Sequence, residues 1–238
     1  MKYLIIGSNS FSGSNFVNFL LSKKNIVRGV SRSKEINSVF LPYKNNKNIK
    51  NFTFHKIDLN KDIEKLVNIC DTFKPNFIIN FSAQGMVAES WKSPLDWYNT
   101  NLIAQVKFHE KIRNKKYIKK YVHFTTPEVY GSTSNLINEN FNFAPSTPYA
   151  TSRAACDLHL MTFFKAYNFP VIFTRAANVY GAHQQMFRIV PKTFFSILNK
   201  SKLNLHGGGK SIRSFIHIND VCEATYKICL KGKIGQTY

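Results

Sequence analysis

Two short stretches of the chain carry side chains that could move a proton and a hydride together. Tyr149 and Arg153 are four residues apart in a predicted helix, so they share one helix face. A phenol beside a fixed cation loses its proton more easily than a free tyrosine, whose pKa is about 10. Thr126 follows a predicted strand, and its hydroxyl could hydrogen-bond the substrate oxygen whose proton Tyr149 takes. This is the equipment for oxidising an alcohol by hydride transfer to a nicotinamide, NAD or NADP. Glu128 adds a carboxylate that alcohol oxidation alone does not need.

The composition is that of a globular protein with a basic surface. The 238 residues suffice for one large domain or one and a half, and 44% of them are hydrophobic. The formal net charge is +20, but the basic residues are scattered and Asn is also abundant. We therefore expect a solvated basic face, one that attracts an anionic nucleotide, and no nucleic-acid partner. No apolar run approaches the ~20 residues of a membrane span, and the first residues do not form a signal peptide, so we expect a cytoplasmic protein without membrane contact.

Cysteine and histidine spacing gives no sign of a metal site. No C-x-x-C motif occurs, so the four cysteines are expected to be reduced and mostly buried. No histidine is spaced with Cys, Asp or Glu as a metal site requires. We therefore expect no metal.

Apolar strand-like runs alternate with amphipathic segments along the chain, which predicts βαβ units and a parallel sheet. A long loop is expected over residues 84–98 and a helix N-cap at Asn219–Asp220. Strands are expected near residues 2–6, 26–30, 52–56, 77–81, 120–124 and 170–174, and helices near 11–22, 61–73, 95–113, 149–167, 187–199 and 219–230.

The turn after the first expected strand fits a dinucleotide site. It keeps two of the usual three glycines, Gly7 and Gly13, with Ser10 in the middle and Phe11 opening the helix. Glycines there let the backbone approach a pyrophosphate, which then lies on the helix N-terminus. The alternative is an ordinary strand-to-helix turn.

Two later strand ends offer contacts to the adenosine half of a dinucleotide. Ser31 and Arg32 end the second strand, where NAD-preferring proteins usually carry an acid. Because an arginine can pair with a 2′-phosphate, this favours NADP, although Arg32 could equally be a solvent-exposed loop residue. Asp58, followed by Leu59, either accepts from the adenine amino group or caps the next helix.

Further polar or small residues follow strands that come later in the chain. Ser82 and Ala83 end the fourth strand, where small side chains let a cofactor pass. Cations and amides near a sheet edge suit a diphosphate-linked substrate, with surface salt bridges as the alternative for the arginines. The candidate substrate-binding residues are Glu89, Asn178, Arg188 and Arg213.

Together these stretches resemble the extended short-chain dehydrogenase/reductase family, and within it the nucleotide-sugar 4,6-dehydratases of dTDP-glucose and GDP-mannose type. The resemblance covers essentially the whole chain. It rests on residues 125–131, the pair Tyr149/Arg153, residues 175–181 and residues 213–221.

The resemblance implies an α/β fold, a Rossmann-type doubly wound parallel sheet with a small C-terminal substrate-binding part that looks truncated. It divides the chain into an NAD(P)-binding domain over 1–180, to which 211–230 return, and a partial substrate-binding region over 181–238. Relatives are commonly dimers through a helix pair, so a homodimer is possible.

The resemblance also assigns roles. Tyr149 takes the proton of the sugar C4 hydroxyl, Thr126 hydrogen-bonds the same oxygen, and Glu128 removes the C5 proton. Arg153 stands where relatives have a lysine that holds the nicotinamide ribose, so Tyr149 and Arg153 also contact the cofactor. Pro127 stands where many relatives have an Asp that protonates the leaving C6 hydroxyl, and GDP-mannose dehydratases look similar in lacking it. The product would be a 4-keto-6-deoxy nucleotide sugar.

Three other functions use the same residues differently. A 4-epimerase needs Tyr149 and Thr126 but no elimination base, so Glu128 argues against it. A decarboxylase of the same scaffold can share the Glu and needs an extra cation for the substrate carboxylate. A non-catalytic cofactor-binding relative would be consistent with Ser10, Pro127 and Arg153.

Overall fold

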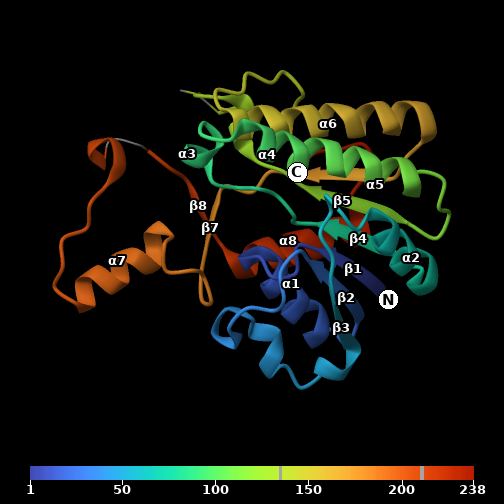
Figure 1. The fold of residues 1–238 in the computed structure, drawn as a ribbon, viewed down its shortest axis with the longest axis horizontal. Coiled ribbons are helices and arrows are strands. Elements are labelled where there is room, and N and C mark those ends of the chain that lie inside the picture. Colours follow the sequence, from blue (N-terminus) through green and yellow to red (C-terminus); the bar gives the residue numbers. More distant parts are fainter. Residues whose placement is uncertain (134–135, 210–211) are drawn as a thin grey trace.

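A six-stranded parallel sheet forms the centre of the computed structural model, which describes residues 1–133, 136–209 and 212–238 (Figure 1). Its strand order is β3-β2-β1-β4-β5-β6, the order of a doubly wound Rossmann-type sheet. The strands are β1 (Lys2–Ile6), β2 (Ile26–Ser31), β3 (Phe52–Lys56), β4 (Phe77–Asn80), β5 (Lys120–Phe124) and β6 (Val171–Thr174).

Helices cover both faces of this sheet, and a second, two-stranded sheet lies beside it (Figure 1). The helix α7 (Ile189–Leu198) lies apart from the main sheet. The small sheet pairs β7 (Asn178–Tyr180) with β8 (Phe215–His217) in parallel. The remaining helices are α1 (Phe11–Ser22), α2 (Ile63–Phe73), α3 (Val87–Ser90), α4 (Pro94–Tyr98), α5 (Ala104–Ile112), α6 (Pro148–Tyr167) and α8 (Ile218–Lys231).

Alternation along β1 explains why the sheet has a hydrophobic core on each face. Tyr3 and Ile5 are buried in one core with residues of α1 and α8, whereas Leu4 and Ile6 are buried in the other with residues of α2, α5 and α6. Successive side chains of a strand point to opposite faces, so a strand covered on both sides must be apolar throughout. Burying each such side chain stabilises the fold by about 1.5–3 kcal/mol before entropy is counted.

The longest helix, α6, begins and ends at residues suited to those positions. Thr147 is its N-cap and accepts a hydrogen bond from the Ala150 amide, and Pro148 occupies the first turn, where its missing N–H costs nothing. Asn168 ends it in the left-handed conformation, φ 53°. These ends fix Tyr149 in the first turn of α6.

The structure confirms the six expected strands and the six expected helices, with two corrections. Residues 84–98 are not one loop, because α3 and α4 lie within them. The N-cap of α8 is His217 and not Asn219–Asp220; the His217 ring nitrogen accepts from the Asn219 amide at 3.3 Å. The division into domains stays a prediction.

A π-helical segment, Asn99–Ile103, joins α4 to α5 and directs Asn101 into the interior. The Asn101 amide group accepts from the Gln84 amide at 2.7 Å and donates to the Gln84 carbonyl at 3.1 Å. It also donates to the Ser152 hydroxyl at 3.0 Å, which in turn donates to the Tyr149 carbonyl at 2.7 Å. One buried asparagine thus connects the chain after β4 to the first turn of α6, as a structural hydrogen bonder.

In the part of the chain that the structure describes, no helix has the length and apolar character needed to cross a membrane. Cys70, Cys156, Cys222 and Cys229 are all buried, as their spacing led us to expect.

Replacing the buried Asn101 with Ala should lower the free energy of unfolding by about 2–3 kcal/mol, because Gln84 and Ser152 lose their hydrogen bonds to its side chain. Asn99→Ala, at an exposed residue of the same π-helical segment, is the matched control and should stay within about 0.5 kcal/mol of the parent. Urea unfolding of the three proteins measures both values. Equal stability of the two variants would contradict the connecting role of Asn101.

Candidate active site

Five of the candidate cofactor residues lie in turns that follow the carboxyl ends of parallel strands, where open α/β sheets bind ligands: Gly7, Ser10, Arg32, Asp58 and Ser82. Gly7, after β1, has φ 84°, and a Cβ there would lie 2.8 Å from the Ser82 amide nitrogen after β4. A Cβ on Gly13 would lie 2.2 Å from the Gly7 carbonyl oxygen. Only glycine fits at both positions, because each approaches backbone atoms of another turn.

Ser10 takes part in this turn as the N-cap of α1. Its hydroxyl donates to the Gly7 carbonyl at 2.7 Å and accepts from the Gly13 amide at 3.0 Å. Phe11 begins the helix with its ring in the hydrophobic core. The α1 N-terminus, with two close-packed glycines and a small hydroxyl residue, has the form of a pyrophosphate cradle. The residues present therefore fit a dinucleotide.

The residues after β2 and β3 occupy the expected place beside this cradle. Ser31 accepts from the Asn9 amide at 2.9 Å, and Arg32 is exposed. Asp58 does not cap α2, which begins at Ile63; its carboxylate accepts from the Asn60 amide at 2.9 Å. Leu59 is buried in the hydrophobic core, so its side chain is not free to contact a ligand.

The turn after β4 is held from below by buried polar side chains. Ser82 is half-buried, and its hydroxyl donates to Asn80 Oδ1 at 2.6 Å. Gln105 Nε2 donates to the same Ser82 hydroxyl at 3.2 Å. Ala83 is exposed at the edge. These bonds fix the small-residue turn that faces Gly7.

The chain brings Thr126, Glu128 and Tyr149 together at the carboxyl end of β5. Thr126 is the N-cap of the 3-10 turn Pro127–Tyr130, and its hydroxyl accepts from the Glu128 amide at 3.2 Å. The Thr126 side chain also acts on the Tyr149 phenol and lowers its pKa. A phenol, a hydroxyl and a carboxylate therefore face one small region.

Burial decides the direction of the Tyr149 pKa. Desolvation raises the pKa of the phenol above its usual range, and the Glu128 carboxylate raises it further. Arg153, Thr126 and Arg188 act in the opposite direction without reversing the shift. The sequence led us to expect that Arg153 lowers the pKa of Tyr149 below its usual value. In the protein without cofactor that expectation is wrong, because burying a phenolate costs more free energy than the arginine returns.

Glu128 is half-buried, and its burial raises the pKa of its carboxyl above the usual range, with Arg213 acting in the opposite direction. A carboxylate with a raised pKa is a stronger base than a free one. The charge of Arg213 lowers the pKa of Glu128, and the charge of Arg188 lowers that of Tyr149. Both arginines are exposed enough to meet an anion.

The other two candidate substrate residues are placed differently. Asn178, at the start of β7, donates its side-chain N–H to the Ser214 carbonyl at 3.0 Å and so joins β7 to the segment before β8. Glu89 is exposed on α3, which lies against α6. Neither is brought into contact with Tyr149 by the described residues, and their binding roles stay predictions.

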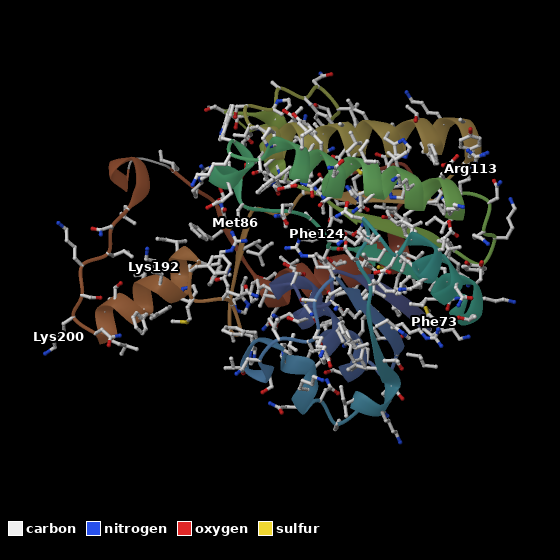
Figure 2. All side chains as sticks on the ribbon, in the orientation of Figure 1. Phe73, Met86, Arg113, Phe124, Lys192 and Lys200 are labelled. Atoms are coloured by element: carbon white, nitrogen blue, oxygen red, sulfur yellow. The ribbon has the colours of Figure 1, made fainter. Side chains whose placement is uncertain are left out.

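Arg153 lies inside the protein, with 1% of its surface exposed. Its guanidinium donates to the Phe124 carbonyl and, at 3.4 Å, to the Ser82 carbonyl. It therefore joins α6 to the ends of β4 and β5, near the middle of the molecule where Figure 2 shows Phe124. Its side-chain bonds to the protein are thus directed at backbone carbonyls of the two strand ends.

The sequence did not lead us to expect the buried cluster of His123, Asp157 and Arg175 that adjoins Arg153. His123 Nε2 lies 3.4 Å from Arg153 Nη2 and 3.5 Å from Asp157 Oδ1. Asp157 Oδ2 accepts from Arg175 at 3.2 Å, and the Arg175 guanidinium packs on aromatic rings, Tyr130 among them. The spacing of Tyr149, Arg153 and Asp157 at i, i+4 and i+8 was the available signal.

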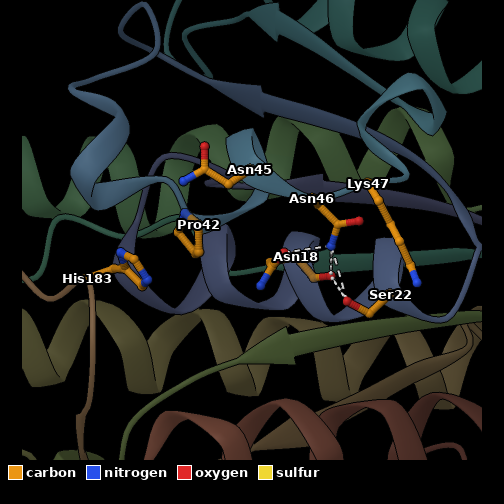
Figure 3. A pocket seen from close by; sticks show the side chains of 7 residues that line it. All are labelled: Asn18, Ser22, Pro42, Asn45, Asn46, Lys47 and His183. Atoms are coloured by element: carbon orange, nitrogen blue, oxygen red, sulfur yellow. Dashed lines mark hydrogen bonds between the residues drawn. The ribbon is translucent and has the colours of Figure 1, made fainter.

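Two further features lie outside this arrangement. A hollow of about 600 Å³ beside α1 is lined mainly by amides and hydroxyls, among them Asn18, Ser22 and Asn46, and Figure 3 shows the bonds of the Asn46 side chain to the other two. It holds no acid, base or nucleophile of the site. Over the described ranges, no three or more His, Cys, Asp or Glu side chains are grouped to hold a metal ion.

The chain belongs to the GDP-mannose 4,6 dehydratase family, whose family model matches residues 4–238. A curated relative, the dTDP-D-glucose 4,6-dehydratase of Dictyostelium discoideum, is 33% identical over 254 residues, covering 100% of this chain and 57% of that protein. The chain thus spans little more than half the length of that relative.

Solved structures give the same picture of the fold. The dTDP-glucose 4,6-dehydratase of Bacillus anthracis, in complex with NAD, matches with a TM-score of 0.88 at 29% identity, covering 100% of this chain and 74% of that one. A UDP-N-acetylglucosamine 4-epimerase from Methanobrevibacter ruminantium matches with a TM-score of 0.85 at 26% identity, over 99% of this chain and 74% of that one. A preference for NADP finds no support, since the dehydratase structure is a complex with NAD.

Gly13→Ala should weaken NAD binding and lower stability by about 1–3 kcal/mol, because the added methyl group meets the Gly7 carbonyl oxygen and α1 must shift. Gly85→Ala is the stability control, since a Cβ there meets nothing within 4 Å. Calorimetric titration with NAD and thermal unfolding measure the two effects. Unchanged NAD affinity in Gly13→Ala would show that the dinucleotide does not lie on this turn.

Proposed function

We propose that the chain carries the catalytic residues of a nucleotide-sugar 4,6-dehydratase, a carbon-oxygen lyase, and that NAD is its cofactor. The observation that supports this most is the meeting of Thr126, Glu128 and Tyr149 at the end of β5. A phenol and a hydroxyl suffice for alcohol oxidation, whereas the half-buried carboxylate adds the base that an elimination needs.

The side chains then divide the steps of the reaction among them. Tyr149 takes the proton of the sugar C4 hydroxyl once it is ionised, a form that Arg153 favours against the cost of burial. The Thr126 hydroxyl orients the same oxygen. NAD, when bound, would supply the acceptor for the C4 hydride and the donor of that hydride to C6, and C5 would then take up a proton from solvent. The new C4 ketone acidifies the C5 proton, which Glu128 removes as water leaves from C6.

The leaving C6 hydroxyl needs a proton, and Pro127 cannot give one. Glu128 carries a proton once it has taken the one from C5, and its raised pKa favours that protonated form. We therefore propose that the same carboxyl group, or water, protonates the leaving oxygen. Arg188 and Arg213 are the proposed phosphate-binding cations, because both are exposed and their charges act on Tyr149 and Glu128.

A 4-epimerase is the second candidate, since an epimerase of the same fold matches over 99% of this chain. Glu128 separates the two functions, because returning a hydride to C4 needs no base at C5. The dehydratase is the proposal that uses every group at the site.

Mass spectrometry of products from NAD and a panel of nucleotide hexoses, including dTDP-glucose and GDP-mannose, tests the assignment. The proposal expects one substrate to lose the mass of one water. An unchanged mass with altered chromatographic mobility would identify an epimerase, and loss of carbon dioxide a decarboxylase. Bound NAD with no conversion of any hexose would contradict the proposed activity of this chain.

Glu128→Gln should slow water loss by about 100-fold or more while the substrate still reduces bound NAD, because only the C5 base is missing. Glu139→Gln, at an exposed carboxylate, is the control and should behave as the parent. Tyr149→Phe should abolish NAD reduction as well. Absorbance of the reduced nicotinamide and product analysis separate the two steps, and normal dehydration by Glu128→Gln would remove Glu128 as the base.

The pH dependence of water loss follows from the same group. The Glu128 base must be ionised, and burial raises the pKa of its carboxyl. Water loss should therefore fall as the pH drops through a value above the ordinary range of a glutamate.

A further inference from the structure

We propose that Asp157 is a positioning residue for Arg153, acting together with His123, and that it thereby sets how strongly Arg153 favours the Tyr149 phenolate. The inference rests on the proposed role of Tyr149 as the base. It concerns residues beneath the site, which do not touch the reacting atoms.

Burial makes Arg153 dependent on a counter-charge. Its side chain is almost fully buried, and its described hydrogen bonds go to two neutral carbonyls and one imidazole. A buried cation needs both hydrogen bonds and an opposite charge, since desolvation otherwise costs more than the bonds return. The charges of Arg153 and Asp157 interact, since Arg153 lowers the pKa of the Asp157 carboxyl, and both side chains leave α6 on one face, four residues apart.

Asp157 is itself held on its other side. Arg175 donates to its Oδ2 at 3.2 Å, and Arg175 is in turn packed on the rings of Tyr130, Phe141 and Phe143 at 5.0–5.2 Å from its Cζ. The Asp157 carboxylate thus binds one buried guanidinium group directly and reaches a second, that of Arg153, across His123. Because Arg175 is fixed by its aromatic cage, the carboxylate offers Arg153 a counter-charge at a fixed position.

His123 fills the gap between Asp157 and Arg153. Its Nε2 lies 3.4 Å from Arg153 Nη2 and 3.5 Å from Asp157 Oδ1. Burial and the neighbouring arginines hold the pKa of His123 well below its usual range, so the ring is neutral and adds no third positive charge. A neutral ring can accept from Arg153 and so keep the guanidinium directed at the strand ends.

Burial raises the pKa of Asp157 to about 6, with both arginines acting in the opposite direction, so the carboxylate is ionised at neutral and alkaline pH. Arg153 lowers the pKa of Tyr149, which also faces Glu128 and Arg188. The other titratable or charged groups around the cluster are His109, Tyr121, Cys156, His159 and Arg175.

The cluster matters for this chain because an arginine stands where the resemblance leads us to expect a lysine. A planar guanidinium has a longer and more rigid head than an ammonium group, and its direction decides which atoms it reaches. Displacing it from the strand ends by a small distance changes its effect on Tyr149. Removing the Asp157 carboxylate would by itself lower the pKa of Tyr149, because a negative charge is lost. A rise of this pKa on loss of Asp157 would therefore show that Arg153 has moved away from Tyr149, as a positioning role predicts.

The test compares Asp157→Asn with Asp71→Asn, a control at another carboxylate that binds a lysine and a tyrosine. The protein carries NAD and tyrosine labelled with carbon-13 at Cζ, and the Tyr149 resonance is assigned by its loss in Tyr149→Phe. We expect the pKa of Tyr149 to rise in Asp157→Asn and to stay unchanged in Asp71→Asn. A fall or no change in Asp157→Asn would overturn the proposal, since a merely structural carboxylate would alter stability alone.

The rate of NAD reduction gives a second, independent measurement. With the hexose that the parent converts, Asp157→Asn should slow NAD reduction by about tenfold while KM stays within about twofold, because Asp157 does not touch substrate. In an Arg153→Met background, Asp157→Asn should cause no further slowing. Equal slowing in both backgrounds would show that Asp157 does not act through Arg153.

Two outcomes need a further measurement: an Asp157→Asn variant that does not fold, and a parent protein that reduces no NAD. If Asp157→Asn does not fold, His123→Phe removes the Nε2 that accepts from Arg153 and keeps an aromatic ring in place. It should raise the pKa of Tyr149 in the same direction; no rise would overturn the proposal. If the parent reduces no NAD with any hexose, the proposed function fails, whereas the Tyr149 titration still decides the role of Asp157.

Discussion

The buried Arg153 guanidinium is the interaction on which the site depends. It binds carbonyl oxygens at the ends of β4 and β5, so a side chain from α6 fixes the distance between that helix and the sheet edge. Tyr149 lies one turn earlier on the same helix, and Thr126 follows β5 by two residues. The geometry of phenol and hydroxyl is therefore set by a charge that needs its own compensation inside the protein.

A parallel sheet makes this arrangement possible, because the carboxyl ends of its strands share one edge. Gly7 and Gly13 let the turn after β1 approach both the α1 N-terminus and the turn after β4. On the other side of the edge, Asn101 holds the chain after β4 against α6. The turn expected to bind the cofactor and the residues expected to carry out the chemistry are thus connected through the ends of β4 and β5.

The sequence predicted the strands, the long helices and the meeting of Thr126, Glu128 and Tyr149, because periodicity and strand-end position are local properties. It did not predict α3, a single turn that packs against α6, and it gave α4, the π-helical segment and α5 as one helix over residues 95–113. It also gave the wrong sign for the Tyr149 pKa, because the depth of burial depends on long-range packing. The Asp157 cluster escaped notice for the same reason, although its i+4 spacing from Arg153 was visible.

The central claim is that the hydride taken from C4 of the sugar is the one delivered to C6, with Glu128 removing the C5 proton between the two transfers. A nucleotide hexose deuterated at C4, incubated with the protein and NAD, tests this most directly. The account predicts a 4-keto product whose C6 methyl group carries the deuterium, as measured by nuclear magnetic resonance. A dehydrated product with an unlabelled methyl group, or deuterium retained at C4, would contradict it.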